Sequence, residues 1–290
     1  MTTHTASELA GHKLRMLKLF IRAIAISLWL IAIAAYFVFQ PKNLLMATSG
    51  YSDLDLKRLD NRRRTDLETK DHEHYKIWSF EVPQAKQNVV LCRGMTGNVA
   101  SGPVLGKISM FNRLGCNVYA FDYFGPNKAG ASNADRFPDV ACAVCDWVAR
   151  TRNCRRDQIV LYGASFGGDV MAQAATKGPL HSLILDCAPF SVAMILHDSA
   201  PIARIIYPTW ALPVNKFETD KVVRSLTVPV LFIHGKLDEV VPWQETKRLY
   251  DAAAEPKTLV LLPNSGHVEQ DMSPEDRKTL EEALRGFLKL

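Results

Sequence analysis

Three residues with complementary chemistry each follow an apolar stretch of the chain. Ser165 lies between Gly163 and Gly167, directly after the apolar residues 159–162, and Asp238 and His267 follow the apolar stretches 230–233 and 259–262. A serine hydroxyl needs a base to take its proton and a carboxylate to orient that base. The chain order Ser165, Asp238, His267 therefore predicts a catalytic triad of nucleophile, acid and base at the ends of three strands.

Two other residues compete for these roles. Asp186 also ends an apolar stretch and is an alternative acid to Asp238. His234 precedes Gly235 inside a predicted strand-turn and is an alternative base, although a structural role suits it better. Both alternatives stay open at the level of sequence.

Acyl transfer also needs N–H donors that stabilise the negative charge developing on a carbonyl oxygen. The backbone N–H of Phe166, next after the nucleophile, is one candidate. The N–H of Met95 is the second, because Gly94 allows the loop after residues 89–92 to turn. Arg93 places a cation beside this loop, where it binds either an anionic substrate group or a local carboxylate.

Composition excludes several other classes of protein. The net charge is only +5 and the basic residues are scattered, without the interleaved aromatic residues of a nucleic-acid surface. No group of His, Asp and Glu has metal-ligand spacing, and no dinucleotide-binding glycine motif opens a first helix. We therefore expect no metal, no cofactor and no nucleic acid partner; the sequence makes no prediction of oligomeric state.

Short apolar stretches alternate with helical patterns from residue 74 to residue 290. This alternation predicts an α/β domain built on a doubly wound, mostly parallel sheet. The strands are expected at 75–82, 89–92, 118–121, 159–162, 183–185, 230–233 and 259–262, and the clearest helices near 104–114, 140–148 and 280–288.

The N-terminal part of the chain has a different pattern. Residues 23–39 carry no charge, and four Lys or Arg residues stand just before them, within 13–22. This predicts a transmembrane anchor over 23–39, a cytoplasmic tail over 1–22 and a juxtamembrane linker over 40–73. A cleaved signal sequence and a buried core helix are the alternatives. The charge bias favours a single-pass protein whose catalytic domain is periplasmic or lumenal, with a cytoplasmic domain as the other topology.

The six cysteines do not suggest a disulfide framework. Cys142 and Cys145 fall inside one predicted helix, where a bridge would be strained. Cys92 ends one predicted strand and Cys116 opens its neighbour, which separates them by a strand length. We expect buried free thiols for most of them.

Residues 188–215 are rich in apolar side chains and too short for a large independent cap. We predict a small cap segment here. Its residues, among them Ile206 and Trp210, either pack on the edge of the sheet or line a groove for an acyl chain.

From residue 78 to the C-terminus the chain resembles the α/β-hydrolase superfamily. The motifs that carry the resemblance are GASFGG at 163–168, RGMTGN at 93–98 and PVLFIHGKLDEVVP at 229–242. With the N-terminal anchor, they are similar to those of the membrane-anchored acyl hydrolases, which include depalmitoylases and lysophospholipase-like enzymes. Members of the superfamily usually have His at the position of Arg93.

The resemblance implies a serine hydrolase that cleaves acyl esters or thioesters, on lipid or protein, through an acyl-enzyme on Ser165. A serine peptidase of similar fold is the alternative within enzymes. A non-catalytic binding or scaffold protein on the same fold is the alternative outside them.

Overall fold

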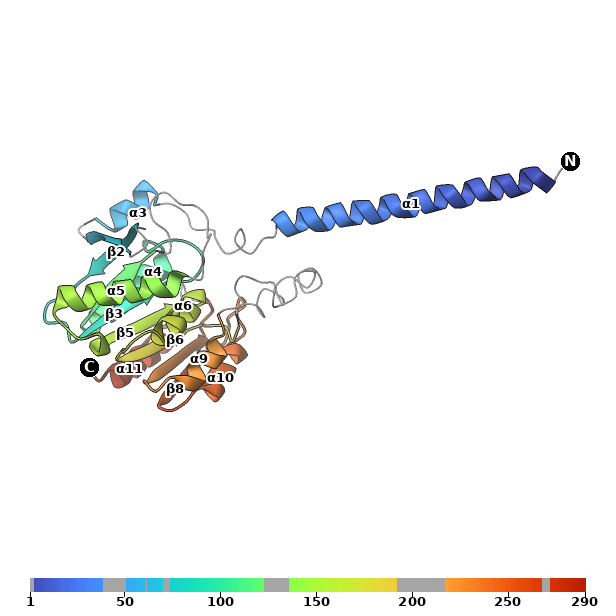
Figure 1. The fold of residues 1–290 in the computed structure, drawn as a ribbon. Coiled ribbons are helices and arrows are strands. Elements are labelled where there is room, and N and C mark those ends of the chain that lie inside the picture. The colour runs from blue at the N-terminus through green and yellow to red at the C-terminus, as the bar shows by residue number, and fades with distance from the viewer. Residues whose placement is uncertain are drawn as a thin grey trace.

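The structure, a computed structural model, describes residues 3–38, 51–60, 62–69, 74–122, 136–191, 217–267 and 272–290. Within them, eight strands form one sheet in the order β1-β2-β4-β3-β5-β6-β7-β8. β1 pairs with β2 and β2 with β4 in antiparallel fashion, and every later pairing is parallel. The predicted doubly wound, mostly parallel sheet is confirmed (Figure 1).

The strands are β1 (Arg63–Glu68), β2 (His74–Phe80), β3 (Gln87–Cys92), β4 (Cys116–Phe121), β5 (Ile159–Ala164), β6 (Ser182–Asp186), β7 (Val230–Gly235) and β8 (Lys257–Leu262). The helices are α1 (Thr3–Val38), α3 (Asp53–Arg58), α4 (Gly102–Arg113), α5 (Phe137–Arg152), α6 (Phe166–Ala175), α9 (Thr219–Ser225), α10 (Trp243–Ala252) and α11 (Pro274–Leu288).

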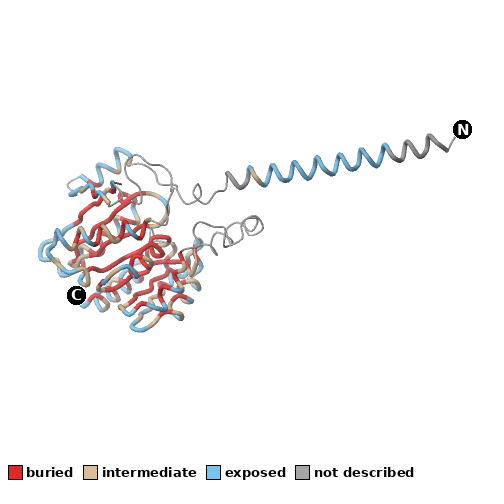
Figure 2. The backbone as a smooth tube through the Cα atoms, viewed as in Figure 1, coloured by how far each residue is buried: buried red, intermediate tan, exposed pale blue. Residues whose placement is uncertain are grey.

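Each face of the sheet packs on its own set of helices. Successive strand residues point to opposite faces, so Val90 joins one core cluster and Val89 the other. The first cluster contains side chains of α5, α6, α9 and α10, and the second contains side chains of α4 and α11. Figure 2 shows the buried backbone concentrated in the strands between these layers. The parallel strands end at the same edge of the sheet, and the predicted site residues follow the strands at this edge.

The sheet begins earlier in the chain than the predicted domain start at residue 74. β1 lies inside the segment 40–73 that we expected to be a linker, and it pairs along its whole length with β2. Its sequence is mostly charged, and Leu67 is its one buried residue. Such an edge strand needs only a single apolar side chain on the core, and the hydrophobic pattern therefore did not reveal it.

α1 projects away from the sheet as one long helix (Figure 1). Its segment His12–Ala34 has a mean hydropathy of 2.1 and none of it is buried, so a buried core helix is excluded for these residues. The helix continues through the basic residues of the predicted tail, because Lys and Arg are good helix formers. Length and composition suit a membrane span, and they suit a signal sequence equally.

All six cysteines are free thiols. Cys92 pairs with Phe121 and Cys116 with Gln87, so the first two cysteines stand at opposite ends of neighbouring parallel strands. Cys142 and Cys145 both lie on α5.

Candidate active site

Ser165 occupies a strained turn between β5 and α6. Its backbone φ of 51° and ψ of −127° lie in a region that residues with a side chain rarely adopt. A Cβ on Gly163 would lie 2.3 Å from the carbonyl oxygen of Gly167, and a Cβ on Gly167 would lie 2.4 Å from that of Arg93. The two glycines are therefore required by close backbone approach, and together they form the nucleophile elbow that the sequence predicts.

Asp238 and His267 meet beyond the ends of β7 and β8. The Nδ1 of His267 donates to Oδ2 of Asp238 at 2.7 Å. Gly235 allows this meeting, because a Cβ there would lie 2.2 Å from the carbonyl oxygen of Ser265 in the histidine loop. The Asp238 side chain is fully buried, whereas that of His267 is 21% exposed. The imidazole can therefore reach both its orienting carboxylate and a substrate.

The carboxylate of Asp238 is held from all sides. Oδ1 accepts the backbone N–H groups of Val240 and Val241, both at 2.8 Å. Oδ2 also lies 3.0 Å from Nε2 of His234, a second and fully buried histidine. Burial alone would raise the pKa of Asp238, but the hydrogen bonds from His234, His267 and Val241 outweigh it and hold that pKa well below its usual range. Asp238 is thus an anion in the folded protein.

His234 is a structural partner of the acid. Its Nε2 faces the Val241 carbonyl at 2.8 Å and the carboxylate of Asp238, which are both acceptors, so Nε2 carries a proton. Its Nδ1 lies 2.6 Å from Oγ1 of Thr246. With both nitrogens engaged in the interior, His234 has none to offer a substrate, which leaves His267 as the candidate base.

Asp186, the alternative acid, is committed elsewhere. Its Oδ2 lies 3.0 Å from Nζ of Lys107 and accepts the Tyr162 hydroxyl at 2.5 Å. Burial would raise the pKa of Asp186, but the charge of Lys107 and the hydrogen bonds from Tyr162, Lys107 and Cys187 together outweigh it and lower that pKa. The main chain of Asp186 nevertheless serves the elbow, since its carbonyl accepts the Ser165 N–H at 2.7 Å.

Arg93 is buried in the loop that follows β3, with 1% of the residue exposed. Its Nε donates to Oδ1 of Asp122 at 2.8 Å, and its Nη1 donates to the carbonyls of Gly94, Met95 and Thr96 at 2.9, 3.3 and 3.3 Å. Of the two roles considered for Arg93, the structure favours the local carboxylate over a substrate anion. The reason is that Nε donates to Asp122, which follows β4, while Nη1 donates to three carbonyls of its own loop.

The loop and the elbow are close neighbours. A Cβ on Gly94 would lie 3.4 Å from Cβ of Ser165 and 4.0 Å from its Oγ. Phe166 opens α6, and the N–H groups of a helix's first turn point out of its N-terminal end. Gly94 therefore lies beside Ser165 and Phe166 follows it directly, and the roles of the Met95 and Phe166 N–H groups as oxyanion donors stay predictions.

Cys187 is a neighbour of the triad that the sequence analysis did not assign to the site. Its Sγ, a carboxylate oxygen of Asp238 and a ring nitrogen of His267 all lie within 4.8 Å of one another. Both oxygens of Asp238 already accept two donors each, so the arrangement suits an oriented imidazole better than a metal ion. Its position one residue after β6 is the only sequence signal of this proximity.

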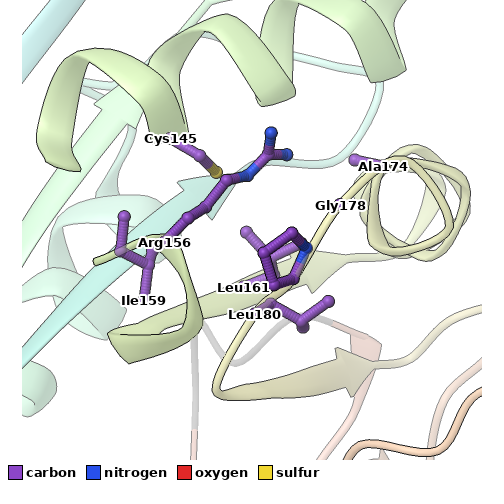
Figure 3. Close-up of a pocket in the computed structure, with 8 residues that line it drawn as sticks. Cys145, Arg156, Ile159, Leu161, Ala174, Gly178 and Leu180 are labelled. Carbon is purple, nitrogen blue, oxygen red and sulfur yellow. The ribbon is translucent and has the colours of Figure 1, made fainter.

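Ile206, Trp210 and nearly all of the predicted cap at 188–215 lie outside the described residues. A small hollow, lined among others by Cys145, Arg156 and Ile159, is drawn in Figure 3. Ile159 begins β5, whereas Ser165 follows its far end, so this hollow lies away from the site.

Comparison with solved structures identifies the fold. The Pyrococcus furiosus esterase Pf2001 superposes on 84% of this chain and 97% of its own with a TM-score of 0.65 at 17% identity. The fold is that of the α/β hydrolases. More specifically, residues 109–289, over half of the chain, match the prolyl oligopeptidase family, and the protein belongs to that family.

Two curated relatives are more similar in sequence. The uncharacterized protein YfhR of Escherichia coli K12 is 30% identical over 188 residues, which cover 62% of this chain and 63% of YfhR. Alpha/beta hydrolase domain-containing protein 17B of Xenopus laevis is 26% identical over 199 residues, which cover 66% and 63%. The chain thus spans less than two thirds of either relative.

Proposed function

We propose that this protein is a membrane-anchored serine hydrolase that cleaves carboxylic esters or thioesters through an acyl-enzyme on Ser165. The observation that carries the proposal is the hydrogen-bonded pair of Asp238 and His267 at the same sheet edge as a serine in a strained elbow. Strain of this kind persists where the surrounding structure enforces it, and it exposes the hydroxyl at the end of the strand.

The proposed reaction has two halves. His267 takes the proton of the Ser165 hydroxyl as Oγ attacks the acyl carbon, and the N–H groups of Met95 and Phe166 stabilise the resulting oxyanion. His267 then protonates the departing alcohol or thiol, leaving the acyl group on Ser165. In the second half, His267 takes a proton from a water molecule that attacks the acyl carbon, and then returns that proton to Oγ of Ser165. The carboxylic acid and the free serine are released. The Asp238 anion stabilises the imidazolium that forms in each half.

An acyl lipid or an acylated protein is the proposed substrate. The exposed apolar helix α1 supports this choice, because an anchor would hold the site at the surface of a bilayer. The sequence similarity to alpha/beta hydrolase domain-containing protein 17B also supports the acyl-hydrolase branch. We further propose that the apolar segment containing Ile206 and Trp210 binds the acyl chain.

Peptide hydrolysis is the second candidate, and the match to the prolyl oligopeptidase family favours it. The same triad can attack an amide, so the geometry of the site does not separate the two reactions. The leaving group distinguishes ester from peptide hydrolysis, since an amine must be protonated before it departs and an alcohol or thiol leaves more readily.

The experiment is a comparison of turnover on p-nitrophenyl esters, acyl thioesters and prolyl peptide anilides of matched size. We expect turnover of esters and thioesters that disappears in Ser165→Ala and persists in Ser109→Ala, an exposed serine on α4. Faster turnover of the anilides would favour the peptidase. Ester turnover that survives in Ser165→Ala would contradict the mechanism.

A further inference from the structure

A short segment before β1 contacts the loop between β3 and α4. This segment, residues 51–58, begins shortly after α1 and includes α3; we call it the brace. The carboxylate of Asp55 accepts the side-chain amide of Asn98 at 3.1 Å, and Nη1 of Arg58 lies 3.4 Å from the carbonyl oxygen of Ala100. Leu59, next after the brace, is 2% exposed and fixes it on the core.

Tyr51, the first residue of the brace, reaches further in. Its hydroxyl donates to Oδ2 of Asp122 and accepts Nε1 of Trp78 at 2.9 Å. Its ring packs on that of Trp78 with the centroids 5.6 Å apart. Burial, and then the charge of Asp122, raise the pKa of Tyr51, so the phenol stays protonated and remains a donor.

Asp122 connects this hydroxyl to the oxyanion loop. One carboxylate oxygen accepts Tyr51 and the other accepts Nε of Arg93. The carboxylate is 8% exposed, so water cannot readily replace either partner. The position of Asp122 therefore sets the position of the guanidinium.

The guanidinium in turn sets the direction of an N–H group. Nη1 of Arg93 donates to the carbonyl of Gly94. The peptide bond between Gly94 and Met95 is planar, and in the trans form its C=O and N–H point in opposite directions. Holding the Gly94 carbonyl toward Arg93 therefore turns the Met95 N–H to the other side of the loop, the orientation that an oxyanion donor must keep through the reaction.

We propose that the brace positions the oxyanion loop through the chain of contacts Tyr51, Asp122 and Arg93, supported by Asp55 on Asn98. The segment adjoining the apolar helix thereby becomes part of the catalytic apparatus as a set of positioning residues. The inference rests on the proposed hydrolase function and adds a region to it that touches no substrate.

The test compares full-length variants in detergent. Tyr51→Phe keeps the ring on Trp78 and removes only the hydroxyl. It should lower kcat and the affinity for an acyl trifluoromethyl ketone about tenfold each, with KM within about twofold. This is less than the 100- to 1,000-fold typical of deleting an oxyanion donor. Asp55→Ala should act in the same direction and by less, because its side chain reaches the loop only through Asn98.

A double-mutant cycle separates positioning from general destabilisation. In the background of Arg93→Lys, Tyr51→Phe should lower kcat by much less than in the wild type, because both residues act through Asp122. Tyr119→Phe is the matched control. It removes a buried hydroxyl that contacts Glu81 at 3.4 Å on another part of the sheet, and it should leave kcat unchanged.

Hydrogen exchange gives a readout that does not need turnover. The amides of residues 94–96 should take up deuterium faster in Tyr51→Phe than in the wild type or in Tyr119→Phe. The inference is overturned if Tyr51→Phe and Asp55→Ala leave exchange, kcat and inhibitor affinity unchanged, or if the cycle is additive. Suppose that the wild type neither turns over esters nor is labelled at Ser165, while residues 94–96 still exchange faster in Tyr51→Phe. That result would overturn the proposed function and would still support the positioning of the loop by the brace.

Discussion

Replacing Asp238 with asparagine exchanges one carboxylate oxygen for an NH₂ group in a site where all four contacts are donors. If the NH₂ faces His267, its hydrogens oppose the N–H groups of His267 and His234. If it faces the other way, they oppose the N–H groups of Val240 and Val241. Neither orientation satisfies the site.

The magnitude follows from this geometry. His267 escapes the conflict by moving its proton from Nδ1 to Nε2, and the nitrogen that should accept the serine proton is then blocked. A wrong tautomer of this kind lowers kcat by about 1,000- to 10,000-fold, or about 4 to 5.5 kcal/mol in the barrier. Opposed donors in the interior also destabilise the fold by about 1–3 kcal/mol.

The assay is kcat for ester turnover per active site, with sites counted by titration, so that unfolded protein does not contribute. Asp186→Asn is the matched control. It breaks the buried pair with Lys107 and should clearly lower the melting temperature. We expect kcat to fall by less than about tenfold. If Asp186→Asn lowered kcat more than Asp238→Asn does, the assignment of the acid would be refuted.

Three further predictions concern stability, substrate and anchoring. Asp169 is fully buried with Oδ2 unpartnered, and burial raises its pKa, so the folded state keeps a proton that the unfolded chain releases above about pH 4. Stability should therefore fall as pH rises, and Asp169→Asn should make the melting temperature less dependent on pH between pH 5 and 8. The same dependence of melting temperature on pH in Asp169→Asn and in the wild type would contradict this. For the substrate, kcat/KM should rise up to about fourfold for each CH₂ added to the acyl chain until the groove is full, and Ile206→Asp or Trp210→Asp should flatten that rise. Equal turnover of acetyl and octanoyl esters would refute the acyl groove. The full chain should resist carbonate extraction, a chain starting near Pro41 should be soluble and active, and a cytoplasmic C-terminal reporter would contradict the proposed topology.

The strands of the core could be predicted because their apolar runs leave little choice. β3, β4, β5, β7 and β8 contain the predicted stretches and extend them by no more than two residues at either end. The elbow and the loop after β7 could also be placed, since each follows such a strand and carries a glycine that close backbone approach requires. The loop after β8 follows such a strand as well, but a Cβ on its Gly266 would make only an ordinary contact of 3.7 Å.

The polar interior could not be predicted in the same way. Whether Arg93 faces a substrate or its own loop depends on Asp122 and Tyr51, which are distant in sequence and carry no periodic pattern. Likewise, the histidine of β7 was expected to be structural, but its contact with Asp238 depends on how the loop after Gly235 turns back. β1 was missed because one buried leucine among charged residues resembles a linker.

The most direct measurement is the location of a fluorophosphonate adduct on the intact protein by peptide mass spectrometry. Only a serine activated by a base reacts quickly with this probe. The account predicts one adduct, on Ser165, that is lost in Ser165→Ala and strongly slowed in Asp238→Asn. An adduct on another serine, or no adduct on folded protein, would contradict it.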